Sequence, residues 1–228
     1  LNTAIPASDS EHDKKACDLY DAQFNRLYLE PLYNQKYPEL LFESLLQKNL
    51  IKQSDLTFIK DGDLETVATE TDFLGVNYYS RGVIRSDEVD EDVNDKPTVD
   101  LGPKTDFGWE VYPQGLYDLL KRLHVEYNVQ DIIITENGCS YSDGPDENKT
   151  INDIKRIEYH KSHVEQIQIA VNDGIPCTGY FAWSFMDNFE WAEGYSQRFG
   201  LVWVDFETLE RIPKESYYWY QNFIKSQK

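Results

Sequence analysis

One glutamate stands where a parallel sheet would expose a reactive side chain. Glu136 follows Ile132-Ile133-Ile134-Thr135, four β-branched residues that predict a buried strand, and it precedes Asn137-Gly138, which predicts a tight turn. A carboxylate on such a fixed backbone points into the mouth of a site, as a nucleophile requires. For an arbitrary glutamate at a strand end, capping a loop or pairing with a surface cation is the commoner role. The residues at the neighbouring strand ends therefore determine whether Glu136 is better explained as a catalytic or as a structural residue.

Two further predicted strands end in side chains suited to the same site. The strand within 72–79 brings a phenol able to donate to a carboxylate, and the strand 177–183 brings an indole face able to stack on a sugar ring. The carboxyl ends of parallel strands meet at one edge of a sheet, so we expect these groups to surround Glu136. The candidates are Asn77 and Tyr79 after the first strand, and Trp183, Glu190 and Trp191 after the second.

The elements between these strands predict the fold class. Helical periodicity is expected over 115–127, 153–172 and 215–225, with earlier helical regions from Ser8 and after Pro38 and an extended piece at 200–205. The repeated order strand, loop, helix predicts parallel α/β construction. Without a glycine-rich phosphate loop, a nucleotide-binding open sheet is disfavoured against a (β/α)8 barrel.

A closed barrel needs eight strands, and this chain offers three complete units and a remnant at Leu1-Asn2. We therefore predict a single domain over residues 1–228 that is the C-terminal half of a (β/α)8 TIM barrel, about strands 5 to 8 with their helices.

Composition excludes several function classes. The chain has 22 Lys and Arg against 41 Asp and Glu, and its formal charge of −19 would repel nucleic-acid phosphates and anionic membranes. The acidic stretches 87–95 and 143–147 are expected to be solvated loops. Aromatic residues make up 14% of the chain, which suits both a core and a sugar site.

The remaining signals concern redox state, membranes and metals. Cys17, Cys139 and Cys177 have no framework spacing and suit reduced thiols, and with no membrane span or signal peptide they favour the cytoplasm. His160 and His163 have a spacing that could suit a metal, but without a third ligand we expect a solvated helix face. No metal or organic cofactor is predicted.

Several motifs together resemble the family 1 glycoside hydrolases, the β-glucosidases and their relatives. They are Thr135-Glu136-Asn137-Gly138, Asn77-Tyr78-Tyr79, the run from Trp183 to Trp191, Arg198-Phe199-Gly200 and Pro6-Ala7-Ser8-Asp9, in the order and spacing of a barrel. The resemblance covers essentially the whole chain.

It implies a role for each matching residue. Glu136 would be the nucleophile that forms a glycosyl-enzyme, Tyr79 would orient it, and Asn77 would lie near the leaving group. Trp183 would be the floor of the sugar pocket, Glu190 would accept hydrogen bonds from sugar hydroxyls, Trp191 would add an indole donor, and Phe199 would help close the wall or fill core. A carboxylate at Glu190 repels a 6-phosphate, which favours unphosphorylated β-glucosides or cello-oligosaccharides.

One half of the retaining mechanism is missing. Two carboxyls about 5 to 5.5 Å apart are needed, and the family's acid lies in an Asn-Glu-Pro motif that this chain lacks. Leu29-Glu30-Pro31 is not a substitute, because a helical region precedes it. We therefore expect a complementary N-terminal half-barrel chain or self-association, and no nucleic-acid or membrane partner. The alternative is an inactive carbohydrate-binding fragment or scaffold.

Overall fold

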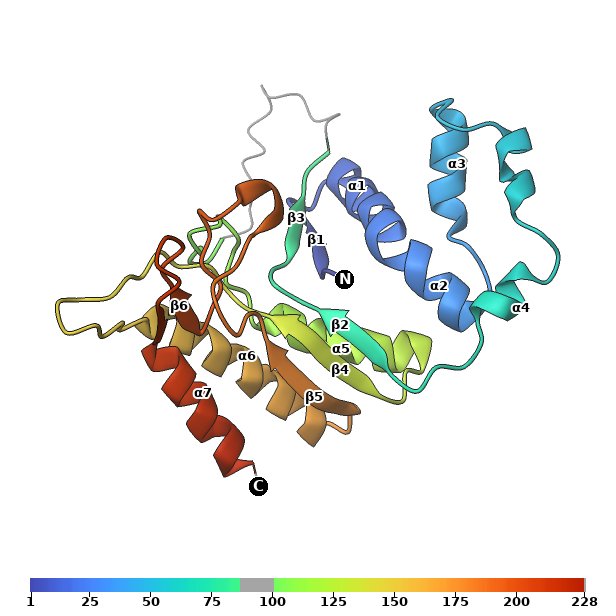
Figure 1. The fold of residues 1–228 in the computed structure, drawn as a ribbon. Helices are drawn as coiled ribbons and strands as arrows, with labels where there is room; N and C mark the ends of the chain where they lie inside the picture. Colours follow the sequence, from blue (N-terminus) through green and yellow to red (C-terminus); the bar gives the residue numbers. More distant parts are fainter. Residues whose placement is uncertain (87–100, 228) are drawn as a thin grey trace.

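A three-stranded parallel sheet lies at the centre of the computed structural model, which describes residues 1–86 and 101–227 (Figure 1). Its strands, in spatial order, are β2 (Leu74–Asn77), β4 (Ile132–Asn137) and β5 (Cys177–Ala182). Each predicted strand is present within two residues of its expected carboxyl end. The chain therefore has the expected α/β half-barrel organisation. Of the two acidic stretches, 143–147 lies in a loop, and 87–95 falls outside the described residues.

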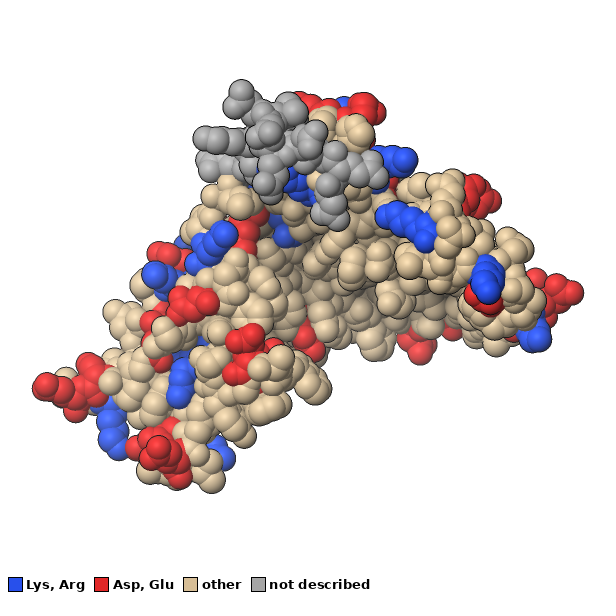
Figure 2. Space-filling model, turned by 90° about the horizontal axis from the view of Figure 1, so that it is seen from above, with Lys and Arg blue, Asp and Glu red and all other residues tan. Residues whose placement is uncertain are grey.

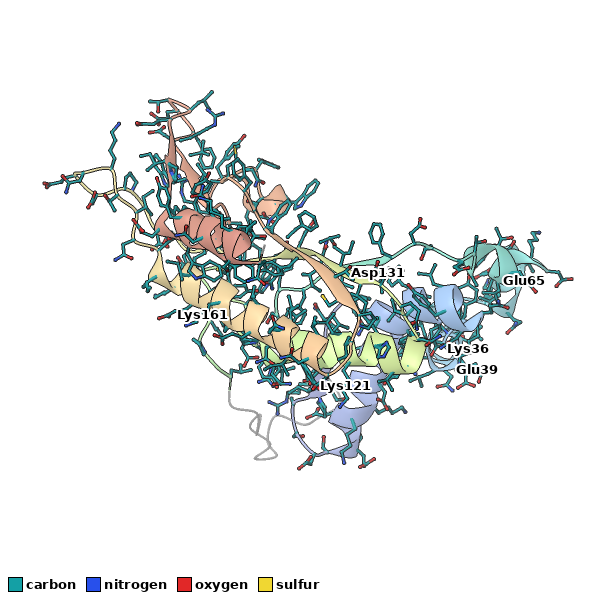
Figure 3. All side chains as sticks on the ribbon, turned by 90° about the horizontal axis from the view of Figure 1, so that it is seen from below. Lys36, Glu39, Glu65, Lys121, Asp131 and Lys161 are labelled. Atoms are coloured by element: carbon teal, nitrogen blue, oxygen red, sulfur yellow. The ribbon has the colours of Figure 1, made fainter. Side chains whose placement is uncertain are left out.

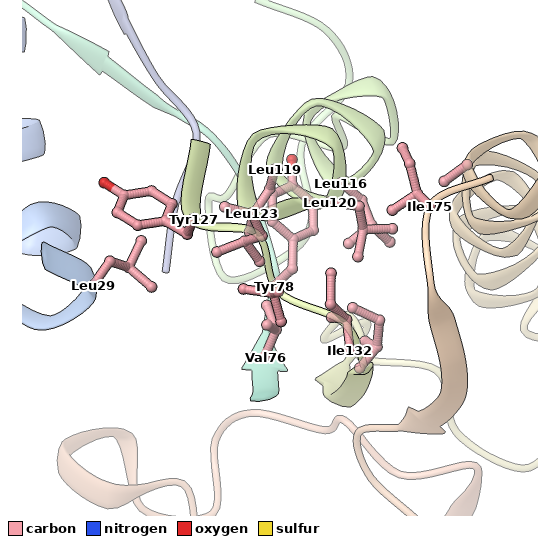
Figure 4. Close-up of a cluster of buried hydrophobic side chains, with 13 residues drawn as sticks. Leu29, Val76, Tyr78, Leu116, Leu119, Leu120, Leu123, Tyr127, Ile132 and Ile175 are labelled. Atoms are coloured by element: carbon pink, nitrogen blue, oxygen red, sulfur yellow. The ribbon is translucent and has the colours of Figure 1, made fainter. Parts of the chain in front are cut away.

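Helices α5 (Gln114–Tyr127) and α6 (Ile154–Asn172) cover one face of this sheet. Seen from below in Figure 3, they run across the sheet with Lys121 and Lys161 on their outer surface. The helix α5 contributes four leucines at helical spacing, Leu116, Leu119, Leu120 and Leu123, each at most 2% exposed. They pack on Val76, Ile132 and Ile134 of the strands to form the main core (Figure 4).

The opposite face of the sheet is open. Strand side chains alternate in direction, so while Val76 and Ile134 point to the helices, Gly75 and Asn77 are exposed. Phe181 on β5 is 59% exposed. In a complete barrel this face lines the interior and is filled by the other strands. Figure 2 shows a broad band of uncharged atoms across the middle of the molecule seen from above.

The first quarter of the chain differs from its prediction. The expected strand remnant at Leu1-Asn2 is displaced to β1 (Ala4–Pro6), which pairs in parallel with β3 (Gly82–Ile84) apart from the central sheet. The single helical region expected from Ser8 is three pieces: α1 (Glu11–Asp21), a π-helical segment (Ala22–Arg26) and α2 (Leu27–Asn34). Ser10 is the N-cap, because its hydroxyl oxygen accepts a hydrogen bond of 3.1 Å from the Asp13 backbone amide. Glu30 and Pro31 lie within α2, as expected for a sequence unrelated to a strand end.

The remaining elements complete the connections. They are α3 (Glu39–Gln47), a 3-10 helix (Gln53–Phe58), α4 (Asp63–Val67), a 3-10 turn (Trp191–Glu193), the antiparallel pair β6 (Val202–Val204) and β7 (Arg211–Pro213), and α7 (Glu215–Ser226). Among the residues described, no helix is both long and apolar enough to cross a membrane.

Candidate active site

Glu136 and Tyr79 form a direct hydrogen-bonded pair at the carboxyl edge of the sheet. The Tyr79 hydroxyl donates to Glu136 Oε2 at 2.6 Å. The pKa of Tyr79 is raised well above its ordinary value, first by burial and then by the Glu136 carboxylate, so the phenol remains a donor. The structure thus brings together the two residues that the sequence placed on neighbouring strands.

An irregularity in the sheet aims Glu136. Val76 pairs with Ile134, but the next residue, Asn77, pairs with Glu136, so Thr135 is the additional residue on β4. Such a bulge redirects the side chains beside it. The Thr135 hydroxyl donates to Asn77 Oδ1 at 2.7 Å and thereby orients the Asn77 amide. Asn77 therefore lies beside the nucleophile candidate with a fixed side-chain orientation.

Trp183 and Glu190 lie close to the same carboxylate. Burial raises the pKa of Glu190, a hydrogen bond from the Trp183 side chain lowers it, and the Glu136 charge raises it again. The backbone amide of Trp183 donates to the carbonyl of Asn137 at 2.9 Å. The strand ends of β4 and β5 thus place Glu136, Trp183 and Glu190 in one cluster.

Gly138 has a steric role that the expectation of a tight turn did not include. A Cβ at this position would lie 1.7 Å from the Trp183 carbonyl oxygen. Only a glycine permits this close approach of the two backbones. The residue after the Glu136-Asn137 pair therefore determines how close Trp183 can come.

The last two predicted site residues have contrasting environments. Trp191 is 80% exposed on its 3-10 turn, whereas Phe199 is 3% exposed. The Phe199 ring lies edge-on to Tyr79 with ring centroids 6.2 Å apart. The structure therefore brings Phe199, but not Trp191, into the packed surroundings of the Tyr79 ring.

Two further aromatic residues belong to the packed surroundings of the Tyr79 ring and were not predicted as site residues. Trp109 lies 5.2 Å from the Tyr79 ring, between centroids, and Phe107 lies 4.2 Å from Trp109. Both belong to the connection before α5, so no strand end pointed to them. The connection is held by Glu110, which makes a two-point ion pair with Arg81 at 2.7 and 2.9 Å.

The loop after β5 is anchored by Asp187. Its buried carboxylate accepts from Arg198 at 2.6 Å, from the Gly200 amide at 2.9 Å and from Lys214 at 3.3 Å. Its oxygens are committed to holding the loop that carries Glu190 and Trp191. Asp187 is therefore an anchor of this loop.

The expectation of a solvated face at His160 and His163 is wrong. Both side chains are 0% exposed, and burial lowers their pKa values to about 3 and about 4. Their spacing of three residues places them on the face of α6 that packs against the sheet. The apolar residues Ile157, Val164 and Ile167 lie at helical spacing with His160, so the helical pattern could have indicated this burial.

Comparison with known proteins identifies the class that the half barrel and its strand-end site define. Such a carboxylate at the carboxyl edge of a parallel sheet is typical of (β/α)8-barrel enzymes. The chain belongs to glycosyl hydrolase family 1, whose family model matches residues 1–228.

The relatives differ in their substrates. The chain is 42% identical over 226 residues to β-glucosidase A of Thermotoga maritima, covering 97% of this chain and 48% of that protein. It is 38% identical over 250 residues to a 6-phospho-β-galactosidase of Staphylococcus epidermidis, with coverages of 99% and 53%. A solved family 1 β-glucosidase from Thermotoga maritima superposes with a TM-score of 0.84 at 39% identity, covering 99% of this chain and 49% of that structure. The chain thus spans about half the length of the relatives it matches.

Proposed function

We propose that this chain supplies the nucleophile half of a retaining β-glycosidase. The observation that carries the proposal is the 2.6 Å hydrogen bond from Tyr79 to Glu136 Oε2, at the edge where barrel enzymes build their sites. In this role Glu136 attacks the anomeric carbon, the bond to the aglycone oxygen breaks, and a covalent glycosyl-enzyme forms. Water then releases the sugar. Tyr79 holds one carboxylate oxygen in place so that the other faces the sugar.

The residues around the pair suit a sugar. The Trp183 indole would stack on the ring, Glu190 would accept from its hydroxyls, and the oriented Asn77 amide would lie towards the leaving group. Trp191, exposed in the structure, would add its indole donor when the sugar binds, and Phe199 would support the wall behind Tyr79.

Glu190 favours an unphosphorylated substrate. Family membership alone leaves this open, because the relatives include a β-glucosidase and a 6-phospho-β-galactosidase. Glu190 lies close enough to Glu136 for the Glu136 charge to raise the pKa of Glu190. A sugar phosphate would meet two carboxylates there, whereas sugar hydroxyls would donate to them. We therefore assign unphosphorylated β-glucosides or cello-oligosaccharides as the substrate class.

The general acid has to come from a complementary half barrel. The open face of the central sheet, with Gly75, Asn77 and Phe181 exposed, is the surface that four further strands would cover. We propose the N-terminal half of a family 1 barrel as the occupant of this face. Closing the barrel would bring the second carboxyl opposite Glu136.

Reconstitution tests this function. The chain is co-expressed with the N-terminal half of Thermotoga maritima β-glucosidase A, and hydrolysis of 4-nitrophenyl β-glucoside is compared with that of its 6-phosphate. We expect a 1:1 complex that prefers the unphosphorylated substrate. Glu136→Gln should lower kcat by at least ~1000-fold, whereas Glu147→Gln, an exposed loop carboxylate, serves as the matched control.

A covalent probe gives an independent answer. A 2-deoxy-2-fluoro glucoside should label the complex at Glu136, as read by peptide mass spectrometry. A purified complex that binds glucose but neither turns over nor labels would instead identify an inactive carbohydrate-binding protein. Full activity in Glu136→Gln would reject the nucleophile assignment.

A further inference from the structure

A buried hydrogen-bonded network lies behind the nucleophile pair. Through Tyr159, His160, Asn137 and Tyr180 it joins α6 to β4, to β5 and to the backbone just after β2. Asn137, Tyr159 and His160 are at most 1% exposed. Because this face of the sheet points away from the open interior, none of the four has a place in the sugar site proposed above.

Asn137 is the centre of the network. Its Nδ2 donates to the Tyr78 carbonyl at 2.8 Å and to the Tyr159 hydroxyl at 3.2 Å, while its Oδ1 accepts from Tyr180 at 2.8 Å. Exchanging the amide oxygen and nitrogen would set two acceptors against each other at Tyr78, so the amide has one orientation.

Tyr159 extends the network to the residue that holds the nucleophile. Its hydroxyl accepts from Asn137 and donates to the Tyr79 carbonyl at 2.9 Å. The same hydroxyl therefore touches the residue after Glu136 and the backbone of Tyr79. The Tyr180 hydroxyl donates its only proton to Asn137 Oδ1, so it can only accept from His160. His160 Nδ1, 2.8 Å from this hydroxyl, is therefore the donor.

The sheet itself is irregular where this network acts. The ladder between β2 and β4 shifts register after Val76, and the ladder between β4 and β5 shifts between Ile134 and Asn137. A further shift lies between Ile132 and Ile133. Backbone hydrogen bonds remain at the strand ends, where the Tyr78 amide donates to the Glu136 carbonyl and the Trp183 amide donates to the Asn137 carbonyl, both at 2.9 Å. The side-chain network adds hydrogen bonds between the strands where the ladder is irregular.

We propose that Tyr159 is a positioning residue for the nucleophile, acting through its hydrogen bonds to the Tyr79 carbonyl and the Asn137 amide. This inference rests on the proposed function of Glu136, and it assigns a role in that function to a residue of α6. Tyr180 and His160 act one step further away by fixing the Asn137 amide.

Tyr159→Phe in the reconstituted complex tests the proposal, because it removes one oxygen and keeps the ring. A misplaced nucleophile is costly to the chemical step, so we expect kcat and the rate of fluoro-sugar labelling at Glu136 to fall by roughly 10- to 100-fold. KM and the affinity for glucose should change less than about twofold, because the sugar pocket is untouched. Tyr180→Phe should act in the same direction with a smaller loss.

The control is Tyr127→Phe, a buried tyrosine of α5 outside the network. It should leave kcat unchanged, because the Tyr127 hydroxyl does not contact the Asn137 amide or the Tyr79 carbonyl. Equal kcat in the wild-type complex and in both Tyr159→Phe and Tyr180→Phe would overturn the positioning role. The proposed function fails separately, when the wild-type complex shows no turnover that depends on Glu136. If Tyr159→Phe does not assemble, Tyr180→Phe alone decides by the same split between kcat and KM.

Discussion

The two faces of the central sheet come from the same three strands and have opposite properties. On the helix side, Val76, Ile132 and Ile134 are at most 1% exposed against the leucines of α5. On the interior side, Phe181 is 59% exposed, and Gly75 and Asn77 are open to solvent. Strand alternation thus separates the chain's own stability from its chemistry. The helix side is packed within this chain, whereas the interior side is the face that the proposed partner would cover.

Gly138 tests how closely the strand ends must approach at the boundary of these faces. Gly138→Ala would place a methyl carbon 1.7 Å from the Trp183 carbonyl oxygen, so the backbone has to move. We expect a loss of about 4 kcal/mol in the free energy of unfolding, measured by urea denaturation. Gly144→Ala is the matched control, since a Cβ there meets nothing within 4 Å. Equal stability of the two variants would contradict the close approach.

Substitutions at Leu120 and Phe181 allow a direct comparison of the two faces of the central sheet. Leu120→Ala empties a fully buried position, and we expect it to lower the free energy of unfolding by about 3 kcal/mol. Phe181→Ala should cost the chain alone less than about 0.5 kcal/mol, because its ring is mostly in water. In the reconstituted complex, Phe181→Ala should weaken assembly, as measured by size-exclusion chromatography across a dilution series. A large loss from Phe181→Ala in the isolated chain would show that this face is already covered.

The buried histidines give the helix side a pH dependence. The pKa of His163 is about 4 in the folded chain, below its ordinary value of about 6.5 in the unfolded chain. Between these values the unfolded state binds more protons, so stability is full above pH 6.5 and falls as the pH decreases. We expect a slope of up to about 1.4 kcal/mol per pH unit for each histidine. Urea denaturation from pH 6.5 to 4.5 should show a reduced slope for His163→Phe relative to the unsubstituted chain. Identical slopes in the two proteins would refute the burial of a neutral His163.

Elements with a strong local pattern could be predicted from the sequence. The β-branched run at 132–135 and the leucine spacing in α5 each depend on a few adjacent residues, and the structure places both within two residues of expectation. The pairing of Tyr79 with Glu136 followed from one geometric rule, that parallel strands end at one edge. Local periodicity and a single packing rule were therefore sufficient to predict that Tyr79 and Glu136 lie together at the centre of the candidate site.

The unpredicted features depend on contacts between distant segments. Trp109 approaches the Tyr79 ring across 30 residues of sequence, and no local pattern of charge or hydrophobicity distinguishes it from an ordinary loop residue. The burial of His160 also depends on packing against the sheet, although this residue lies at helical spacing with the apolar Ile157 and Ile167. The π-helical segment within the first helical region was not predicted either. A bulge such as that at Thr135 is likewise visible only when both strands are paired.

Asp187 connects the loop that carries Glu190 to the end of the chain. Lys214, which contributes its ammonium group to Asp187, immediately precedes α7, so the placement of the loop depends on how that helix docks. Substitutions on the outer surface of α7 therefore offer a route by which the position of Glu190 would change while the side chains beside Glu136 stay constant.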